Sequence, residues 1–248
     1  MKSTIKHLGV IMDGNRRWAK ARKMPFFKGH RAGYKKTEDI LRWCRDAGIK
    51  ILTLYAFSTE NWQRSKKEVN FLMNLFYLAL TKDIKKLHKN NICVRVIGRK
   101  KGLSKKIQKA IEKSEELTKN NTAIILNLAI NYGGRLELVD AFNKILSARG
   151  GSQPKADQPL AGAKSSGGKN SPKEITEDLI SRNIYTAGLP DPDLIVRTSG
   201  EKRLSGFLTW QSAYSEFCFV KRHWPEFSKK DFDDVINDFA SRQRRLGK

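Results

Sequence analysis

The sequence predicts an α/β fold, a single domain with a central, mostly parallel β-sheet flanked by helices. The first indication is that short apolar runs alternate along the chain with longer segments of helical periodicity. The second is that polar motifs follow the apolar runs, at the strand ends where parallel sheets bind their ligands, so we expect these motifs to build one site. Hydrophobic residues make up 39% of the 248 positions, which is enough to build a core and excludes a wholly disordered chain.

The elements follow from these patterns in chain order. Apolar runs predict strands at residues 8–12, 51–57, 93–97, 123–130, 194–196 and 217–220. Helical spacing predicts helices at residues 29–46, 66–90, 104–120, directly after 135, and at 231–242. Half of residues 150–173 are Gly, Pro or Ser, so we expect a flexible surface insertion there, within one domain that spans residues 1–248.

The charge balance indicates the kind of partner. The chain has 49 Lys and Arg against 25 Asp and Glu, a net charge of +24, which favours nucleic acid, an anionic membrane surface or a phosphorylated small substrate. The apolar stretch at residues 71–80 is too short for a membrane span, and the first residues lack the pattern of a secretory signal. Three widely spaced cysteines form no disulfide or metal pattern, so we expect a cytoplasmic protein with reduced thiols.

The motif DGNRRW at residues 13–18 carries the clearest chemistry. It places the Asp13 carboxylate, a glycine and the guanidinium groups of Arg16 and Arg17 at a strand-to-helix turn. Backbone amides at a helix N-terminus with adjacent arginines suit a diphosphate. A Mg²⁺ ion between Asp13 and the phosphates would offset the repulsion of the carboxylate. The alternative is that Asp13 only caps the helix.

Other polar residues have equally plain structural alternatives. Residues 58–64 (STENWQR) follow the second apolar run but also resemble an ordinary capped loop, whereas residues 197–205 (RTSGEKRLS) suit a second phosphate group. Glu216, in an apolar segment, needs a metal or a salt bridge with an arginine. His30 is a candidate phosphate donor or acid–base group, although a lone histidine is more often structural. The acidic run at 231–234 is expected to serve the first turn of the last helix.

Taken together, these segments resemble the cis-prenyltransferase family, the undecaprenyl diphosphate synthases and their relatives. The resemblance covers nearly the whole chain outside residues 150–173. Its matching segments are HLGVIMDGNRRWAK (7–20), GHRAG (29–33), LTLYAFSTENWQR (52–64) with Glu68, LNLAINYGGR (126–135), DLIVRTSGEKRLSGFLTWQSAYSEF (193–217), WPEFSKKDF (224–232) and RRLG (244–247). It implies the cis-prenyltransferase fold and an enzyme that condenses isopentenyl diphosphate with a C10–C20 allylic prenyl diphosphate. Successive cis additions would give a polyprenyl diphosphate, the precursor of a lipid glycosyl carrier.

The resemblance also implies roles for individual residues. Asp13 would hold Mg²⁺ against the allylic diphosphate, and Glu216 would be a second metal ligand near a dimer interface. Asn61 matches the residue that assists proton removal, and either Asn61 through water or a phosphate oxygen would take the proton. Arg245 and Gly247 match a C-terminal element that reaches the partner's site in some relatives. The substrate-binding positions would be Gly14, Asn15, Arg16, Arg17, Trp18, His30, Ser58, Thr59, Glu60, Trp62, Arg64, Arg197, Arg203, Leu204, Ser205 and Gly247.

The chain departs from the family pattern near the primer site. Phe26 stands where the family usually has an arginine, which removes a diphosphate contact. Phe71 and Phe76 add bulk to the helix at 66–90, whose apolar face is our candidate wall of a tunnel for the growing chain. Because Asp13 and the arginines of residues 197–205 are present, we expect an active enzyme and not a non-catalytic partner subunit.

The sequence therefore predicts a homodimeric, cytoplasmic enzyme that uses Mg²⁺ and contacts the membrane peripherally through its lipid product. One alternative is transfer of the prenyl group to another acceptor, or a coupling that is not head-to-tail, which Phe26 and the bulky tunnel residues motivate. The other is a basic nucleic-acid-binding protein. No nucleic-acid partner is expected, because no known nucleic-acid-binding signature occurs in the sequence.

Overall fold

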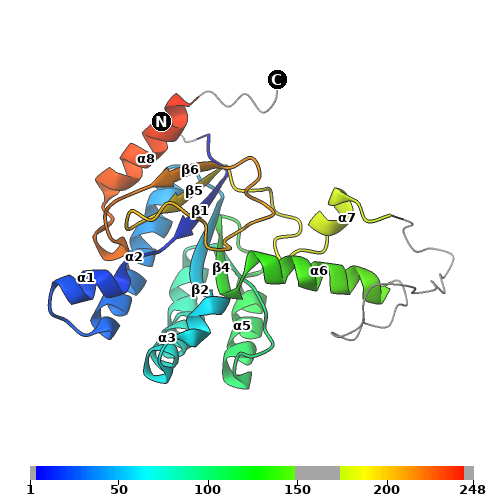
Figure 1. Ribbon diagram of the computed structural model, residues 1–248, viewed down its shortest axis with the longest axis horizontal. Coiled ribbons are helices and arrows are strands. Elements are labelled where there is room, and N and C mark those ends of the chain that lie inside the picture. The colour runs from blue at the N-terminus through cyan, green and yellow to red at the C-terminus, as the bar shows by residue number, and fades with distance from the viewer. Residues whose placement is uncertain (1–3, 149–173, 243–248) are drawn as a thin grey trace. The chain divides into compact units, whose positions relative to one another are not determined.

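The computed structural model describes residues 4–148 and 174–242, and these form two compact units (Figure 1). The first unit comprises Met1–Gly133 and Pro190–Lys248, and the second comprises Gly134–Leu189. The predicted insertion at 150–173 lies outside the described residues. The single-domain organisation stays a prediction.

A six-stranded sheet forms the centre of the first unit. Its strands are β1 (His7–Ile11), β2 (Ile51–Ser58), β3 (Ile92–Ile97), β4 (Ile124–Tyr132), β5 (Leu194–Arg197) and β6 (Glu216–Phe219). They lie in the order β3-β4-β2-β1-β5-β6, and each neighbouring pair is parallel. The predicted α/β fold with a parallel sheet is confirmed. The order of the strands along the chain reverses between β1 and β5. Parallel sheets commonly bind their ligands at such a topological switch point.

The first unit also contains six α-helices within the described residues. They are α1 (Asn15–Ala21), α2 (Phe26–Asp46), α3 (Lys66–Leu78), α4 (Ile84–Lys89), α5 (Lys105–Thr118) and α8 (Lys229–Ser241), with short 3₁₀ turns at Thr59–Gln63 and Trp224–Glu226. Serines begin three of them: Ser65, Ser104 and Ser228 each accept a backbone N–H from the first turn. Asp231 returns the bond to Ser228 in a capping box, which confirms the structural role expected of the acidic run.

The predicted helix at 66–90 is correct in extent but not uniform. A π-helical turn, Ala79–Asp83, separates α3 from α4. Apolar residues keep helical spacing both before and after this turn. The periodicity of the sequence therefore did not reveal the π-helical turn. Such turns are rare and often lie at functional sites. The helix predicted from residue 29 begins at Phe26, directly after the extended Pro25.

The two faces of the sheet are covered differently. Helices α2, α3, α4, α5 and α8 share one core with the sheet, where Trp43 of α2 packs on Phe227 and Phe232. On the opposite face Phe207 stacks on Tyr55 at 4.8 Å between ring centroids. In the described residues, helices are too short or too polar to cross a membrane.

The described helices of the second unit are α6 (Gly134–Ala148) and α7 (Glu177–Ser181). The sequence predicted a helix at the position of α6 but none at α7. The buried Glu137 accepts the backbone N–H of Tyr185 at 2.9 Å, and the Tyr185 hydroxyl donates to Asp140. These bonds connect α6 to the chain after α7.

Candidate active site

Gly14 shapes the turn that follows β1. It has a φ of 97°, in the left-handed region, and caps the start of α1. A Cβ at this position would lie 2.4 Å from the Ser199 Oγ and 2.6 Å from the His223 Nδ1, both side chains that close over the turn. Only glycine fits here, and it turns Asn15, Arg16 and Arg17 into the first turn of α1.

The Asp13 carboxylate lies at the junction of β1 and β5. Its Oδ2 accepts a hydrogen bond from the Arg197 Nη2 at 2.8 Å, and its Oδ1 is 3.1 Å from the Arg17 Nη2. Burial alone would raise the pKa of Asp13, but the hydrogen bonds and charges of Arg197 and Arg17 outweigh it and lower the pKa. The carboxylate is therefore ionised at neutral pH and sits between two cations.

Arg197 and the loop after it form a second basic group. Arg197 is 5% exposed, and its Nη1 donates to the Ser205 Oγ at 2.9 Å and to the Arg203 carbonyl. Glu201 accepts from Arg17 at 2.9 Å and pairs with Arg203, which joins this loop to α1. Leu204 lies in the turn, where its carbonyl accepts the N–H of Phe207. The structure thus brings residues 13–17 and 197–205 together, as the sequence predicted.

A buried carboxylate, Glu68, organises three more cationic or donor groups. It is 3% exposed, and its Oε1 accepts from the His30 Nε2 and from the Arg64 Nη1, each at 3.0 Å. The Arg16 Nη1 lies 3.6 Å from its Oε2. Burial lowers the pKa of His30 despite the opposing effect of Glu68, so the imidazole is neutral at pH 7 and donates its Nε2–H.

Sequence reasoning placed Glu68 in a motif but gave it no role. The signal was the i,i+4 spacing from Arg64 at the start of a helix, which is also what any surface ion pair shows. Only the three-dimensional structure shows that this carboxylate is buried and shared.

The sequence left open whether residues 58–64, after β2, form an ordinary capped loop or part of the binding site, and the structure shows features of both. Asn61 accepts the Ser58 N–H at 3.3 Å and forms a capping box with it, while Thr59 donates to Glu60 at 3.1 Å. Trp62 donates its indole N–H to Asn131 at 2.8 Å. The loop is therefore capped, and it also delivers Arg64 to the site.

The turn after β1, helix α1, the start of α2 and Arg64 line a polar pocket of about 570 Å³, called here the anion pocket. Six basic side chains or neutral donors line it beside Asp13, and Phe26 also lines it, with its ring centroid 6.1 Å from that of His30. Trp18 lies on α1 with the Arg22 guanidinium over its ring. The basic and donor residues are Arg16, Arg17, Lys20, Lys23, His30 and Arg64.

The anion pocket adjoins an apolar cavity of about 330 Å³, and Met12, Asn15 and His30 line both. The cavity lies between α2, α3–α4 and one face of the sheet, because its lining residues recur at helical spacing on the helices and alternate on the strands. The predicted tunnel wall on residues 66–90 agrees with this lining, to which Phe76 contributes. Phe71 instead packs against Phe27.

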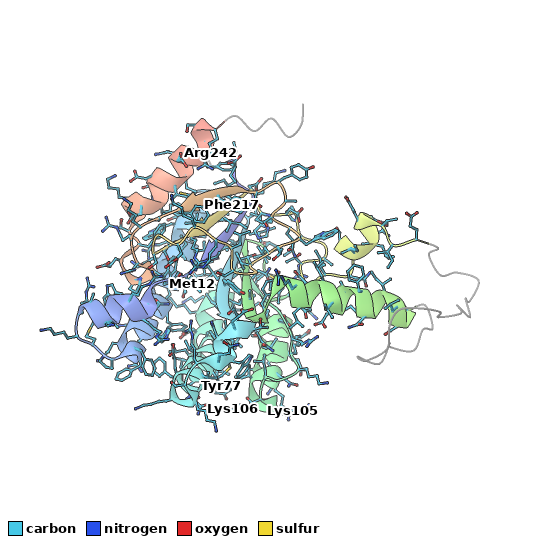
Figure 2. The ribbon with its side chains drawn as sticks, viewed as in Figure 1. Met12, Tyr77, Lys105, Lys106, Phe217 and Arg242 are labelled. Atoms are coloured by element: carbon cyan, nitrogen blue, oxygen red, sulfur yellow. The ribbon has the colours of Figure 1, made fainter. Side chains whose placement is uncertain are left out.

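The structure does not bring Glu216 to Asp13 within one chain. Glu216 pairs in register with Leu194 at the opposite end of the parallel strands from Arg197. There it is bound by Arg242 at 2.7 Å, and Arg242 also donates to the Phe217 carbonyl. Figure 2 labels Arg242, just after α8, and Phe217, on β6. Arg245 and Gly247 lie outside the described residues. The described part of the chain holds no cluster of three metal-ligating side chains.

Comparison with known proteins decides the family. The family model Prenyltransf, whose description reads "Putative undecaprenyl diphosphate synthase", matches residues 11–247. The chain belongs to this family. It is 44% identical over 242 residues to an isoprenyl transferase of Clostridium tetani, covering 98% of this chain and 89% of the relative. It is 47% identical over 245 residues to an isoprenyl transferase of Streptococcus mutans, covering 97% and 92%.

Solved structures agree with this assignment. Lavandulyl diphosphate synthase from Lavandula x intermedia, in complex with dimethylallyl diphosphate, matches with a TM-score of 0.86 and 33% identity over 99% of both chains. A probable undecaprenyl diphosphate synthase from Campylobacter jejuni matches with a TM-score of 0.76 and 33% identity over 98% of this chain and 99% of that one. The resemblance, the cis-prenyltransferase fold and the enzyme class inferred from the sequence are confirmed: the chain is a prenyl transferase.

Proposed function

We propose that this member of the undecaprenyl diphosphate synthase family condenses isopentenyl diphosphate with a C10–C20 allylic prenyl diphosphate. Successive cis additions give a polyprenyl diphosphate that serves as the precursor of a lipid glycosyl carrier. The observation that carries the proposal is that the anion pocket and the apolar cavity are adjacent, with Met12, Asn15 and His30 lining both. A prenyl diphosphate has the matching shape, with a charged head and a hydrocarbon tail.

The anion pocket supplies the charge that the reaction needs. Diphosphate leaves readily only if its negative charge is stabilised while the carbon–oxygen bond breaks. Arg16, Arg17 and Arg64 face that pocket, and the N-terminus of α1 adds its backbone amides. We assign the allylic diphosphate to this pocket, together with Gly14, Asn15, Trp18 and His30.

The second diphosphate, of isopentenyl diphosphate, fits the loop after β5. Arg197, Arg203 and Ser205 are joined there by hydrogen bonds and lie beside Asp13. Two anion sites on either side of one carboxylate hold the alkene of one substrate near the allylic carbon of the other. Ser58, Thr59, Glu60, Trp62 and Leu204 complete the proposed binding surface.

The donor set at Asp13 fits Mg²⁺. Magnesium is usually bound through one or two carboxylates plus substrate phosphates, and Asp13 offers an ionised carboxylate beside the anion pocket. When bound, the ion would neutralise diphosphate charge. A proton leaves in each addition, and we propose that Asn61, oriented by its bond from Ser58, assists this step.

We further propose a cytoplasmic homodimer that contacts membranes peripherally. The net charge of +24 supports a contact with anionic lipid. Glu216 and Gly247 would then act across the dimer interface, since Glu216 lies far from Asp13 in its own chain.

The test is incubation of the full chain with Mg²⁺, radiolabelled isopentenyl diphosphate and a panel of allylic primers, followed by product sizing. We expect a series of polyprenyl diphosphates that disappears with Asp13→Asn and Asp13→Ala. Folded protein that incorporates no label with any primer would refute the proposal. A second candidate, transfer to another acceptor, is favoured by Phe26 in the anion pocket and by the lavandulyl diphosphate synthase match. Product mass and NMR connectivity distinguish the two.

A further inference from the structure

A buried serine in the loop after β5 has an unusual backbone conformation. Ser199 has a φ of 81°, in the left-handed region that L side chains rarely adopt, and it is 7% exposed. The next residue, Gly200, has a φ of 78°, which a glycine adopts without strain. A strained residue keeps such a conformation only where its surroundings hold it, and such residues are frequent at functional sites. The contacts of Ser199 must therefore hold its backbone in place.

Two of these contacts come from the segment that leads into the second 3₁₀ turn. The Ser199 N–H donates to the Arg222 carbonyl at 2.8 Å, and the Ser199 Oγ shares a hydrogen bond with the His223 Nδ1. The next residue, Trp224, donates its backbone N–H to the Asp13 carbonyl at 3.0 Å. One segment therefore bonds both to the loop after β5 and to the turn after β1.

The Ser199–His223 bond closes over Gly14. A Cβ on Gly14 would lie 2.4 Å from the Ser199 Oγ and 2.6 Å from the His223 Nδ1, so both bonded atoms pack directly on this glycine. The Ser199 carbonyl, in turn, accepts from the Arg17 Nη1 of α1 at 3.3 Å. The bond therefore lies where the turn after β1 meets the loop of residues 197–205.

This junction sets how far apart the two proposed diphosphate sites lie. The allylic diphosphate is assigned to the anion pocket beside α1, and isopentenyl diphosphate to the loop of residues 197–205. The new carbon–carbon bond forms only when the alkene is held close to the allylic carbon, so a small displacement of the loop slows the reaction. A bond that connects the loop to the turn after β1 thus acts on the geometry of both substrates.

We propose that Ser199 and His223 are positioning residues, whose shared hydrogen bond places the isopentenyl diphosphate site against the allylic site. The inference rests on the proposed condensation reaction. Without the bond, the strained backbone of Ser199 relaxes and the residues after it move, among them Arg203 and Ser205. The donors that Glu68 holds in the anion pocket belong to other segments and keep their places. The loss therefore falls on isopentenyl diphosphate and leaves binding of the allylic diphosphate intact.

The experiment measures two constants for the full chain with Mg²⁺: the KM for isopentenyl diphosphate, and the affinity for an unreactive allylic thiodiphosphate by calorimetry. Ser199→Ala and His223→Leu each remove the bond and should raise that KM about five- to tenfold, with the affinity for the thiodiphosphate unchanged. The double variant should be no worse than either single one, because both changes remove the same bond. His223→Asn places an amide at the position of Nδ1 and should recover part of the loss.

The matched control is His88→Leu, which removes an exposed histidine from its bond with Asn121 at 3.2 Å and should leave both constants unchanged. A wild-type KM in Ser199→Ala and His223→Leu shows the inference to be wrong while the proposed function stands. Additive effects in the double variant, or an equal loss of affinity for the thiodiphosphate, also overturn it. If wild type incorporates no isopentenyl diphosphate, the function fails and the inference with it. Should Ser199→Ala not fold by circular dichroism, His223→Leu and His223→Asn decide.

Discussion

Glu68 provides a demanding test of how the anion pocket is built. Glu68→Gln keeps the shape of the side chain but removes the charge that the His30 Nε2 and the Arg64 Nη1 share at 3.0 Å. A hydrogen bond to a charged group contributes about 1.5–3 kcal/mol, and the amide oxygen of glutamine retains part of that. Arg16 adds little, since its side chain is 60% exposed and 3.6 Å away.

We expect a loss of about 2–3 kcal/mol in the free energy of unfolding. For a chain of this size that lowers the melting temperature by about 4–12 °C, measured by circular dichroism. Because Arg16, Arg64 and His30 line the anion pocket, the KM for the allylic diphosphate should rise about tenfold, equivalent to about 1.4 kcal/mol.

The control is Glu116→Gln, which breaks an exposed pair with Lys119 and should change stability by less than about 1 kcal/mol. If Glu68→Gln matches wild type in both melting temperature and KM, Glu68 does not position these donors. A loss of stability with unchanged KM would limit Glu68 to a role in folding.

Three further outcomes follow from the same structure. Gly14→Ala forces a Cβ to within 2.4 Å of the Ser199 Oγ at a φ of 97°, so turnover should fall at least about 100-fold; near-normal turnover would show that the turn is not rigid. Burial lowers the pKa of His7, so the unfolded chain binds the proton more readily and stability falls as the pH drops below about 6.5. Urea unfolding from pH 8 downward should show this slope, reduced in His7→Gln, and an equal slope in both proteins would exclude His7 as its source. Chelation of divalent metal should abolish label incorporation, and added Mg²⁺ should restore it; activity that survives chelation contradicts the assignment of Asp13 to the metal.

Much of the fold was readable from local patterns. The strands appeared as apolar runs because most of their side chains are buried, although those of the edge strand β6 are only half-buried. Alternation of strands with helices implies parallel pairing. The association of residues 13–17 with 197–205 was also predictable, since carboxyl ends of parallel strands meet at one edge.

Tertiary structure alone decided the rest. Arg64 is the i,i+4 neighbour of Glu68, but Arg16 and His30 reach the same carboxylate only because α1 and α2 pack beside it, which sequence spacing does not encode. A π-helical turn at Ala79–Asp83 interrupts the helix at 66–90, and its last residue, Asp83, accepts a hydrogen bond from Tyr34 of α2. Glu216 is separated from Asp13 because strand β6 pairs with β5 in a register that places the two at opposite ends of the sheet. The sequence by itself determined the elements and the chemistry of the strand ends, because these depend on burial and local hydrogen bonding. Which charges meet and how wide the cavity is depend on packing between segments distant in the chain.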